Sequence, residues 1–130
     1  MEEFSLSTKK RNEIIDITKE VKKLTKKVKD GICVIFTPHT TTAITVIENY
    51  DPNIAIDFLK SLADNIPQGK WLHDKVDENA DAHIKASIIG PSQIFIIKNR
   101  EIQLGTWQNV VFCEFDGPRE RKVLVETIEK

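Results

Sequence analysis

Three histidines are the residues in this chain of 130 that are best suited to chemistry: His39, His73 and His83. Neutral imidazole is the commonest metal ligand in proteins, and three imidazoles leave a fourth position for water or substrate. The sequence therefore predicts that these histidines bind a divalent ion, and zinc suits nitrogen ligands best. Their spacings match no local zinc motif, so a structural role for each histidine remains the alternative.

Carboxylates close to the histidines in sequence are candidates for proton transfer. Glu48, Asp74 and Asp81 could act as a general base, or could accept the second N–H of a histidine. The pattern does not distinguish these two roles. The alternatives are a solvated loop charge, and for Asp81 a helix cap.

Polar side chains that could hold a substrate accompany these groups. Thr40 and Thr41 follow His39, Asn49 follows Glu48, and Asn79 precedes His83 by four residues. Hydroxyl and amide groups can hydrogen-bond phosphate or sugar oxygens. The threonine run is equally typical of a strand, because β-branched residues fit a pleated surface.

Two arginines flank the turn that begins at Asp116. Arg119 and Arg121 are the best candidates for bidentate anion binding in the chain. A structural salt bridge is the alternative for each. Together with the histidines and hydroxyl groups, they favour a small phosphorylated molecule as the substrate.

The sequence lacks the motifs that are typical of several other classes of protein. The chain has no P-loop, no dinucleotide fingerprint and no G-x-S-x-G sequence. Cys33 and Cys113 lie within apolar runs without a neighbouring base, which predicts buried thiols and a reducing, cytoplasmic location. No apolar run approaches 18 residues, so neither a membrane span nor a standard signal sequence is expected.

Composition predicts one globular domain over residues 1–130, with 40% hydrophobic and 30% charged residues and a net charge of −1. Six lysines between positions 19 and 29 decorate one predicted helix. Because no aromatic residues interleave with these lysines, we do not expect nucleic acid to bind there.

The order of predicted elements is that of an antiparallel, β-rich, sandwich-like α+β domain with about three helices. Residues 67–81 form a long polar segment, which in a compact domain is usually functional or mobile. The first two strands are expected to pair as a hairpin, and the first helix to begin with Thr18 as its cap. Strands are predicted at 3–7, 13–17, 31–37, 40–47, 93–98, 102–104, 107–115 and 121–128, and helices at 18–28, 52–66 and 82–89.

Several segments along the chain form a recognisable set: 37–41, 48–49, 51–52, 72–74, 79–83, 104–108 and 114–119, with Ser92 and Arg121. By these segments the chain resembles the YjbQ-like family of uncharacterised proteins over essentially its whole length. One departure is Arg100, which stands where the family usually has a glycine in a turn.

The resemblance implies an antiparallel α+β fold, a homotrimer, and a pocket around the matched histidines that looks like a metal site. It also implies a thiamine-phosphate synthase activity, which joins a pyrimidine pyrophosphate to a thiazole phosphate and releases pyrophosphate. Zinc bound by histidines suits hydrolysis or lyase chemistry, whereas pyrophosphate transfer usually employs Mg²⁺ with oxygen ligands. The leading hypothesis is therefore a metal-assisted enzyme acting on a small phosphorylated metabolite, and the alternative is a trimeric binding protein without catalysis.

Overall fold

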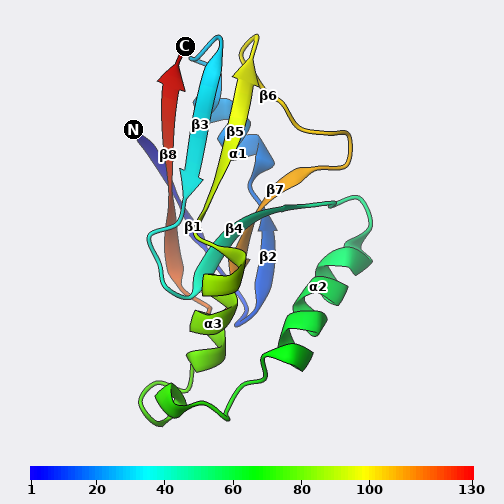
Figure 1. Cartoon of the computed structure of the whole chain (residues 1–130), viewed down its shortest axis with the longest axis vertical. Helices are drawn as coiled ribbons and strands as arrows, with labels where there is room; N and C mark the ends of the chain where they lie inside the picture. The colour runs from blue at the N-terminus through cyan, green and yellow to red at the C-terminus, as the bar shows by residue number, and fades with distance from the viewer.

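The computed structural model describes all residues, 1–130, as an α+β fold with eight strands and three α-helices (Figure 1). None of the helices is long and apolar enough to span a membrane. The elements are β1 Glu2–Ser7, β2 Glu13–Asp16, α1 Thr18–Thr25, β3 Gly31–Phe36, β4 Thr42–Ile47, α2 Pro52–Asn65, a 3-10 turn η1 Leu72–Lys75, α3 Ala80–Ile89, β5 Ser92–Lys98, β6 Glu101–Ile102, β7 Asn109–Glu114 and β8 Glu120–Glu129.

The strands form two antiparallel sheets, ordered β1-β8-β3-β5-β6 and β2-β7-β4. The sheets pack face to face over one apolar core, to which α1 contributes Val21. Strand β7 is buried on both faces because alternate side chains enter different clusters. Phe112 faces the larger sheet, whereas Cys113 and Phe115 face the helices. The smaller sheet is therefore the middle layer of three.

The first two strands do not form the predicted hairpin. β1 pairs with β8 in the larger sheet, and β2 pairs with β7 in the smaller one. Each predicted strand exists, but the polar segment between them crosses from one sheet to the other. The hairpin prediction was wrong because periodicity identifies strands without identifying their partners.

Helix α1 ends at Thr25, three residues earlier than predicted, and carries Val21 and the half-buried Leu24 of the predicted stripe. Val28 follows the helix and is also buried in the core. Thr18 is not the cap of α1, because the helix begins at Thr18 itself and follows Ile17. The Thr18 backbone N–H instead donates to Asp16, and its hydroxyl accepts a hydrogen bond from the backbone of Val110. Thr18 therefore fixes α1 against β7.

Helix α2 begins as predicted, with Asp51 accepting a hydrogen bond from Asn53 N–H and proline at the first helical position. It lies at the edge of the molecule and buries none of its residues fully (Figure 1). Phe58, Leu59 and Leu62 pack partly against the smaller sheet. Helix α3 packs more closely, with Ala82 and Ala86 against β4 and β7.

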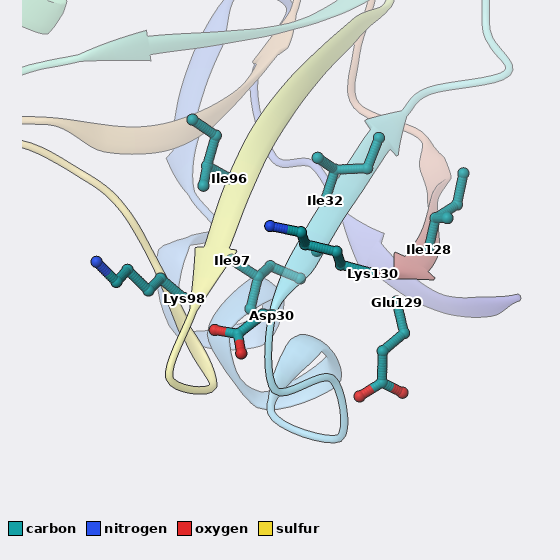
Figure 2. A pocket seen from close by; sticks show the side chains of 9 residues that line it. Asp30, Ile32, Ile96, Ile97, Lys98, Ile128, Glu129 and Lys130 are labelled. Atoms are coloured by element: carbon teal, nitrogen blue, oxygen red, sulfur yellow. The ribbon is translucent and has the colours of Figure 1, made fainter.

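The outer face of the larger sheet is apolar and uncovered. Ile96, Ile32 and Ile128 lie directly opposite one another on β5, β3 and β8, as Figure 2 shows. Ile94 and Ile96 are 66% and 63% exposed. A face of this kind is typical of a surface that contacts another molecule.

Candidate functional site

Most of the sequence-predicted site residues meet at one cavity of about 590 Å³, which we call the histidine pocket. Three segments far apart in sequence form it: the turn before β4, the end of the polar segment with the start of α3, and the turn between β7 and β8. No apolar side chain lines it apart from a proline. Its lining consists of Pro38, His39, Thr40, Thr41, Asp77, Asn79, His83, Asp116, Arg119 and Arg121.

A buried carboxylate, Glu114 at the end of β7, organises the base of the pocket. It is fully buried and accepts two hydrogen bonds from Arg121, at 2.8 and 2.6 Å. The Thr8 hydroxyl donates to it at 2.7 Å, and the backbone N–H groups of Phe115 and Asp116 donate at 3.1 Å each. These five donors fix the carboxylate, and with it the turn that follows.

The two hydrogen bonds to Glu114 hold Arg121 in place, and one nitrogen of its guanidinium group has no partner. Its Nη2 also donates to the Thr41 hydroxyl at 2.8 Å, which aligns Thr41 with the pocket. Nη1 makes no hydrogen bond within the chain. Arg121 is therefore mainly a structural arginine, and Nη1 is the part of it that a bound anion could contact.

The β7–β8 turn presents Arg119 to the pocket. Its Nε donates to the backbone oxygen of Asp116, and its Nη2 donates to the Asp116 carboxylate at 3.1 Å. The same carboxylate accepts a hydrogen bond from Asn79 Nδ2 at 2.8 Å, so Asp116 links α3 to the turn. The Arg119 side chain is 56% exposed and its Nη1 has no partner in the chain. Arg119 is therefore the most available cation of the pocket.

Gly117 allows this turn to pass close to the N-terminal segment. A β-carbon at Gly117 would overlap the Lys10 backbone oxygen and also approach Thr8 Oγ1 and Glu114 Cγ. The Lys10 oxygen belongs to the backbone and cannot rotate away. Only glycine therefore fits this position without displacing a neighbour.

We expect Gly117→Ala to lower the free energy of unfolding by about 1–3 kcal/mol, because the added methyl group overpacks this contact. Urea denaturation monitored by tryptophan fluorescence measures the change. Gly105→Ala is the matched control, since a β-carbon there meets only the flexible Gln108 side chain at 3.4 Å. Equal stability of the two variants would contradict this view of the turn.

His39 lies with its ring against β8. Its Nε2 accepts a hydrogen bond from the Lys122 backbone N–H at 3.0 Å, which places the proton of the neutral ring on Nδ1. Burial lowers the pKa of His39, and the nearby charge of Arg121 lowers it further. The ring is therefore a neutral N–H donor at pH values where an ordinary histidine begins to gain a charge.

His83 and His73 lie together on the other side of the pocket. Their rings meet edge to face with centroids 5.0 Å apart. His83 projects from the first turns of α3 and lines the pocket, whereas His73 projects from η1, does not line it, and has Asp77 at 3.7 Å. His83 and His39 thus line the same cavity, whereas His73 contacts the ring of His83 and does not line the cavity.

The three histidines do not fit a metal site formed by one chain. The only free lone pair of neutral His39 accepts the Lys122 N–H, and no three His, Cys, Asp or Glu side chains converge on one point. Metal binding therefore stays a prediction from the sequence. Metal analysis of protein purified without a tag or chelator tests it.

Two of the carboxylates proposed as bases have structural roles instead. Asp74 accepts hydrogen bonds from the backbone N–H groups of Trp71, Ala80 and Gly69, and these bonds lower its pKa. It thereby joins η1 to the start of α3. Both of its oxygens are already engaged in this turn.

Asp81 lies inside α3 and is 1% exposed, so it is not the cap of that helix. It accepts two hydrogen bonds from Arg11 and one from Lys85, which is itself 2% exposed. Burial alone would raise the pKa of Asp81, but the bonds from Arg11 and Lys85 outweigh burial and lower it. Asp81 is thus the anion of a buried ionic cluster.

Glu48 and Asn49 lie outside the histidine pocket. They follow β4, whereas His39 precedes it, and a six-residue strand separates its ends by about 20 Å. Glu48 accepts the Asp51 backbone N–H, and Asn49 donates to Asp16. Within one chain, these two residues cannot contact a ligand held beside His39.

Trp107 is also away from the pocket, and it lies outside the strand that was predicted over residues 107–115. Strand β7 begins at Asn109, and Trp107 is 60% exposed in the preceding turn. It meets the exposed ring of Tyr50 edge to face, with centroids 5.6 Å apart. Gln108 turns back to accept the Gly105 backbone N–H. An exposed aromatic pair therefore lies near Glu48 and Asn49.

The buried charges at Glu114 and Lys85 were not predicted from the sequence, although both carry a signal. Each interrupts a run of apolar residues, between Cys113 and Phe115 and between Ile84 and Ala86. A charge in such a run needs a buried partner. The partner of Glu114 is Arg121, seven residues later, and the partner of Lys85 is Asp81, four residues earlier on the same helix. The sequence alone does not show which of the neighbouring charges is buried with each of them.

The two cysteines are inert, as predicted. Burial raises the pKa of Cys33 to about 11 and that of Cys113 to about 12. Both thiols therefore remain protonated at neutral pH and are poor nucleophiles.

The sequence is similar to those of known proteins over almost its whole length. The chain is 46% identical over 127 residues to a UPF0047 protein of Methanocaldococcus jannaschii, covering 96% of this chain and 91% of that one. YugU of Bacillus subtilis is 40% identical over 125 residues, covering 95% of each chain.

Solved structures show the same fold. A YjbQ/UPF0047 family protein of Clostridium acetobutylicum superposes with a TM-score of 0.94 at 48% identity, covering 98% of this chain and 100% of the other. A protein of unknown function from Sulfolobus solfataricus gives 0.95 at 34% identity, covering 99% and 96%. The family model described as UPF0047 protein YjbQ-like matches residues 2–130. The chain therefore belongs to the YjbQ-like UPF0047 family.

Proposed function

We propose that the chain is an enzyme that binds a small phosphorylated metabolite in the histidine pocket. One observation carries the proposal: hydrogen-bond donors from three segments converge on a cavity without apolar side chains other than a proline. Such a cavity offers little to an apolar ligand and much to a compact, strongly polar one. A phosphoryl group, with its several oxygen acceptors, matches donors arranged in this way.

Anion binding is assigned to side chains with an N–H or O–H group that makes no hydrogen bond within the chain. Arg119 contributes Nη1, and His39 contributes its Nδ1–H. The Thr41 hydroxyl accepts from Arg121 and so has its own hydrogen to donate. Thr40 is exposed at the mouth of the pocket. These groups would hold a phosphate without movement of the backbone.

Proton transfer is assigned to His83, whose ring makes no hydrogen bond within the chain. It lines the same cavity and is half-buried. An imidazole side chain can both accept and donate a proton in general acid–base catalysis. Asp77 lines the pocket beside it. The zinc ion implied by the family resemblance has no matching geometry here, so each role is assigned to a side chain.

Turnover of phosphorylated compounds tests the enzyme proposal. The first assay supplies a pyrimidine pyrophosphate and a thiazole phosphate, with and without Mg²⁺ or Zn²⁺, and measures released pyrophosphate and thiamine phosphate. We expect His83→Gln to abolish turnover of any accepted substrate while ligand binding stays within about threefold. Turnover that survives in His83→Gln would contradict the role of this histidine.

A binding protein without catalysis is the second candidate. It is favoured by the state of the carboxylates, since Asp74, Asp81 and Glu114 are all committed to structural bonds. It predicts a tight ligand that is recovered unaltered after long incubation, with binding still dependent on Arg119.

Association as a homotrimer is part of the same proposal. The uncovered isoleucines of β3, β5 and β8, the outlying α2 and the exposed pair of Tyr50 and Trp107 all supply apolar surface for contacts between copies. Glu48 and Asn49, which are remote from the pocket of their own chain, could reach the pocket of a neighbour in such an assembly.

We expect Ile96→Glu to shift the protein from trimer to monomer, because it places a charge in the centre of the apolar face. Light scattering after size-exclusion chromatography measures the mass. Lys98→Glu, an exposed change on the same strand beyond that centre, is the control and should leave the mass unchanged. A wild-type protein that elutes as a monomer would contradict the assembly.

A further inference from the structure

A second cavity, of about 370 Å³, lies between α1 and the turn from β5 to β6, and we call it the α1 cleft. It shares no residue with the histidine pocket, and Figure 1 places α1 behind the larger sheet, away from α3. Its charged lining consists of five cations and one anion: Lys19, Lys22, Lys23, Lys26, Arg100 and Glu101.

The four lysines form one row along α1. Their spacing of i, i+3, i+4 and i+7 places them on the same helical face, over a length of about 10 Å. Like charges at these spacings repel one another and destabilise a helix. A ligand with several negative charges would relieve this repulsion, and a single phosphate would not span the row.

None of the five cations has a carboxylate partner, although other lysines of the chain do. Lys27 pairs with Glu2, and Lys60 pairs with Asp64. The ion pairs of the chain include neither Arg100 nor the four lysines of the row. The protein has a net charge of −1, so the five cations are a local excess of positive charge around the α1 cleft.

Arg100 closes the cleft in a backbone conformation that glycine would adopt more easily. Its φ is +67°, a region that costs a residue with a β-carbon some strain. Its Nη1 donates to the backbone oxygens of Lys26 and Lys27, which fixes the guanidinium at the end of the lysine row. Nε and Nη2 make no hydrogen bond within the chain. These two hydrogen bonds thus hold a fork-shaped anion-binding group beside the lysines.

We infer that the α1 cleft binds a small molecule carrying at least two phosphate groups, at a site separate from the histidine pocket. The cavity lies within the size range of small-molecule sites. The five cations around it have no carboxylate partner in the chain. No aromatic side chain lines the cleft to stack on a base, which favours a ligand recognised by its phosphates over single-stranded nucleic acid.

Calorimetric titration with inorganic tripolyphosphate tests the inference on the full chain. Lys22→Gln/Lys26→Gln removes two charges from the middle and end of the row, and Arg100→Gly removes the guanidinium while relaxing the backbone. Lys9→Gln/Lys10→Gln is the control, because it removes the same charge from exposed positions elsewhere. We expect both cleft variants to bind at least tenfold more weakly, and the control to bind within twofold of wild type.

Three results would overturn the inference. The first is tripolyphosphate binding that is equal in all variants or absent in wild type. The second is binding that Arg119→Ala abolishes and the cleft variants do not, which would assign it to the histidine pocket. The third is tighter binding of a 20-nucleotide single strand than of tripolyphosphate, lost in the same cleft variants, which would make nucleic acid the ligand.

Discussion

Replacement of Glu114 by glutamine is expected to lower the free energy of unfolding by about 3–5 kcal/mol, because it leaves the buried Arg121 charge without its partner. Glu114 is fully buried and accepts five hydrogen bonds, so an amide of the same size cannot satisfy all of its donors. Urea denaturation measures the loss. The Thr41 hydroxyl and the β7–β8 turn are then expected to lose their fixed positions.

The control for this prediction is Glu3→Gln, which removes a carboxylate from the exposed pair with Lys122 at 3.8 Å. Exposed pairs contribute at most about 1 kcal/mol, so little change is expected. A double variant, Glu114→Leu/Arg121→Met, should recover part of the loss, since it removes both charges together. A Glu114→Gln protein as stable as Glu3→Gln would contradict the structural role of this pair.

Asp81→Asn is the second change with a large expected effect, again about 3–5 kcal/mol. It leaves Lys85 charged in an environment where only 2% of the residue is exposed, and it leaves one acceptor oxygen for the three hydrogen bonds that Arg11 and Lys85 donate. Lys85→Met should cost less, because Asp81 keeps its two bonds to Arg11. A larger loss of stability in Asp81→Asn than in Lys85→Met would indicate a buried ionic cluster. Equal losses would indicate that α3 tolerates no substitution at these positions.

The pH dependence of stability provides a second measurement on Asp81. Its pKa is lower in the folded state than the unfolded value of about 3.9. Its stabilising effect is therefore complete above that value and is lost as the pH falls through the folded pKa. As the pH falls below about 4, the free energy of unfolding of Asp81→Asn should therefore decrease less than that of the wild-type protein. Asp64→Asn, which breaks the exposed pair with Lys60, is the control and should show neither effect.

The local elements could be predicted from the sequence because their signals are local. Asp51 followed by proline marks the start of α2, and alternating apolar residues mark strands such as β5 and β8. Strand pairing could not be predicted in the same way. β1 and β2 join different sheets, and that choice depends on contacts with β7 and β8, more than 90 residues away.

The site was predicted in part, for the same physical reason. Several elements end close to the same cavity, and the residues at or near their ends line it together: His39, Thr41, Asn79, His83 and Arg119. Glu48 and Asn49 were expected there from their residue types, but β4 carries them to its other end.

The roles of the charged residues depended on partners that residue type alone does not identify. Asp81 and Arg121 have the residue types of a base and an anion binder. Arg11 and Glu114, which bind them in the folded chain, come from segments that no local pattern connects to them. Residue type thus selected several side chains that line one polar cavity, while the division between residues with structural bonds and residues with free donors required the structure.

Calorimetric titration with inorganic pyrophosphate tests the central claim, that the histidine pocket binds a phosphorylated ligand, most directly. The titration is made in the Lys22→Gln/Lys26→Gln background, so that the α1 cleft contributes little, and is repeated with Arg119→Ala added. We predict one binding event per chain, weakened at least tenfold by Arg119→Ala with the fold intact by circular dichroism. Pyrophosphate that does not bind, or that binds equally with and without Arg119, would contradict the account.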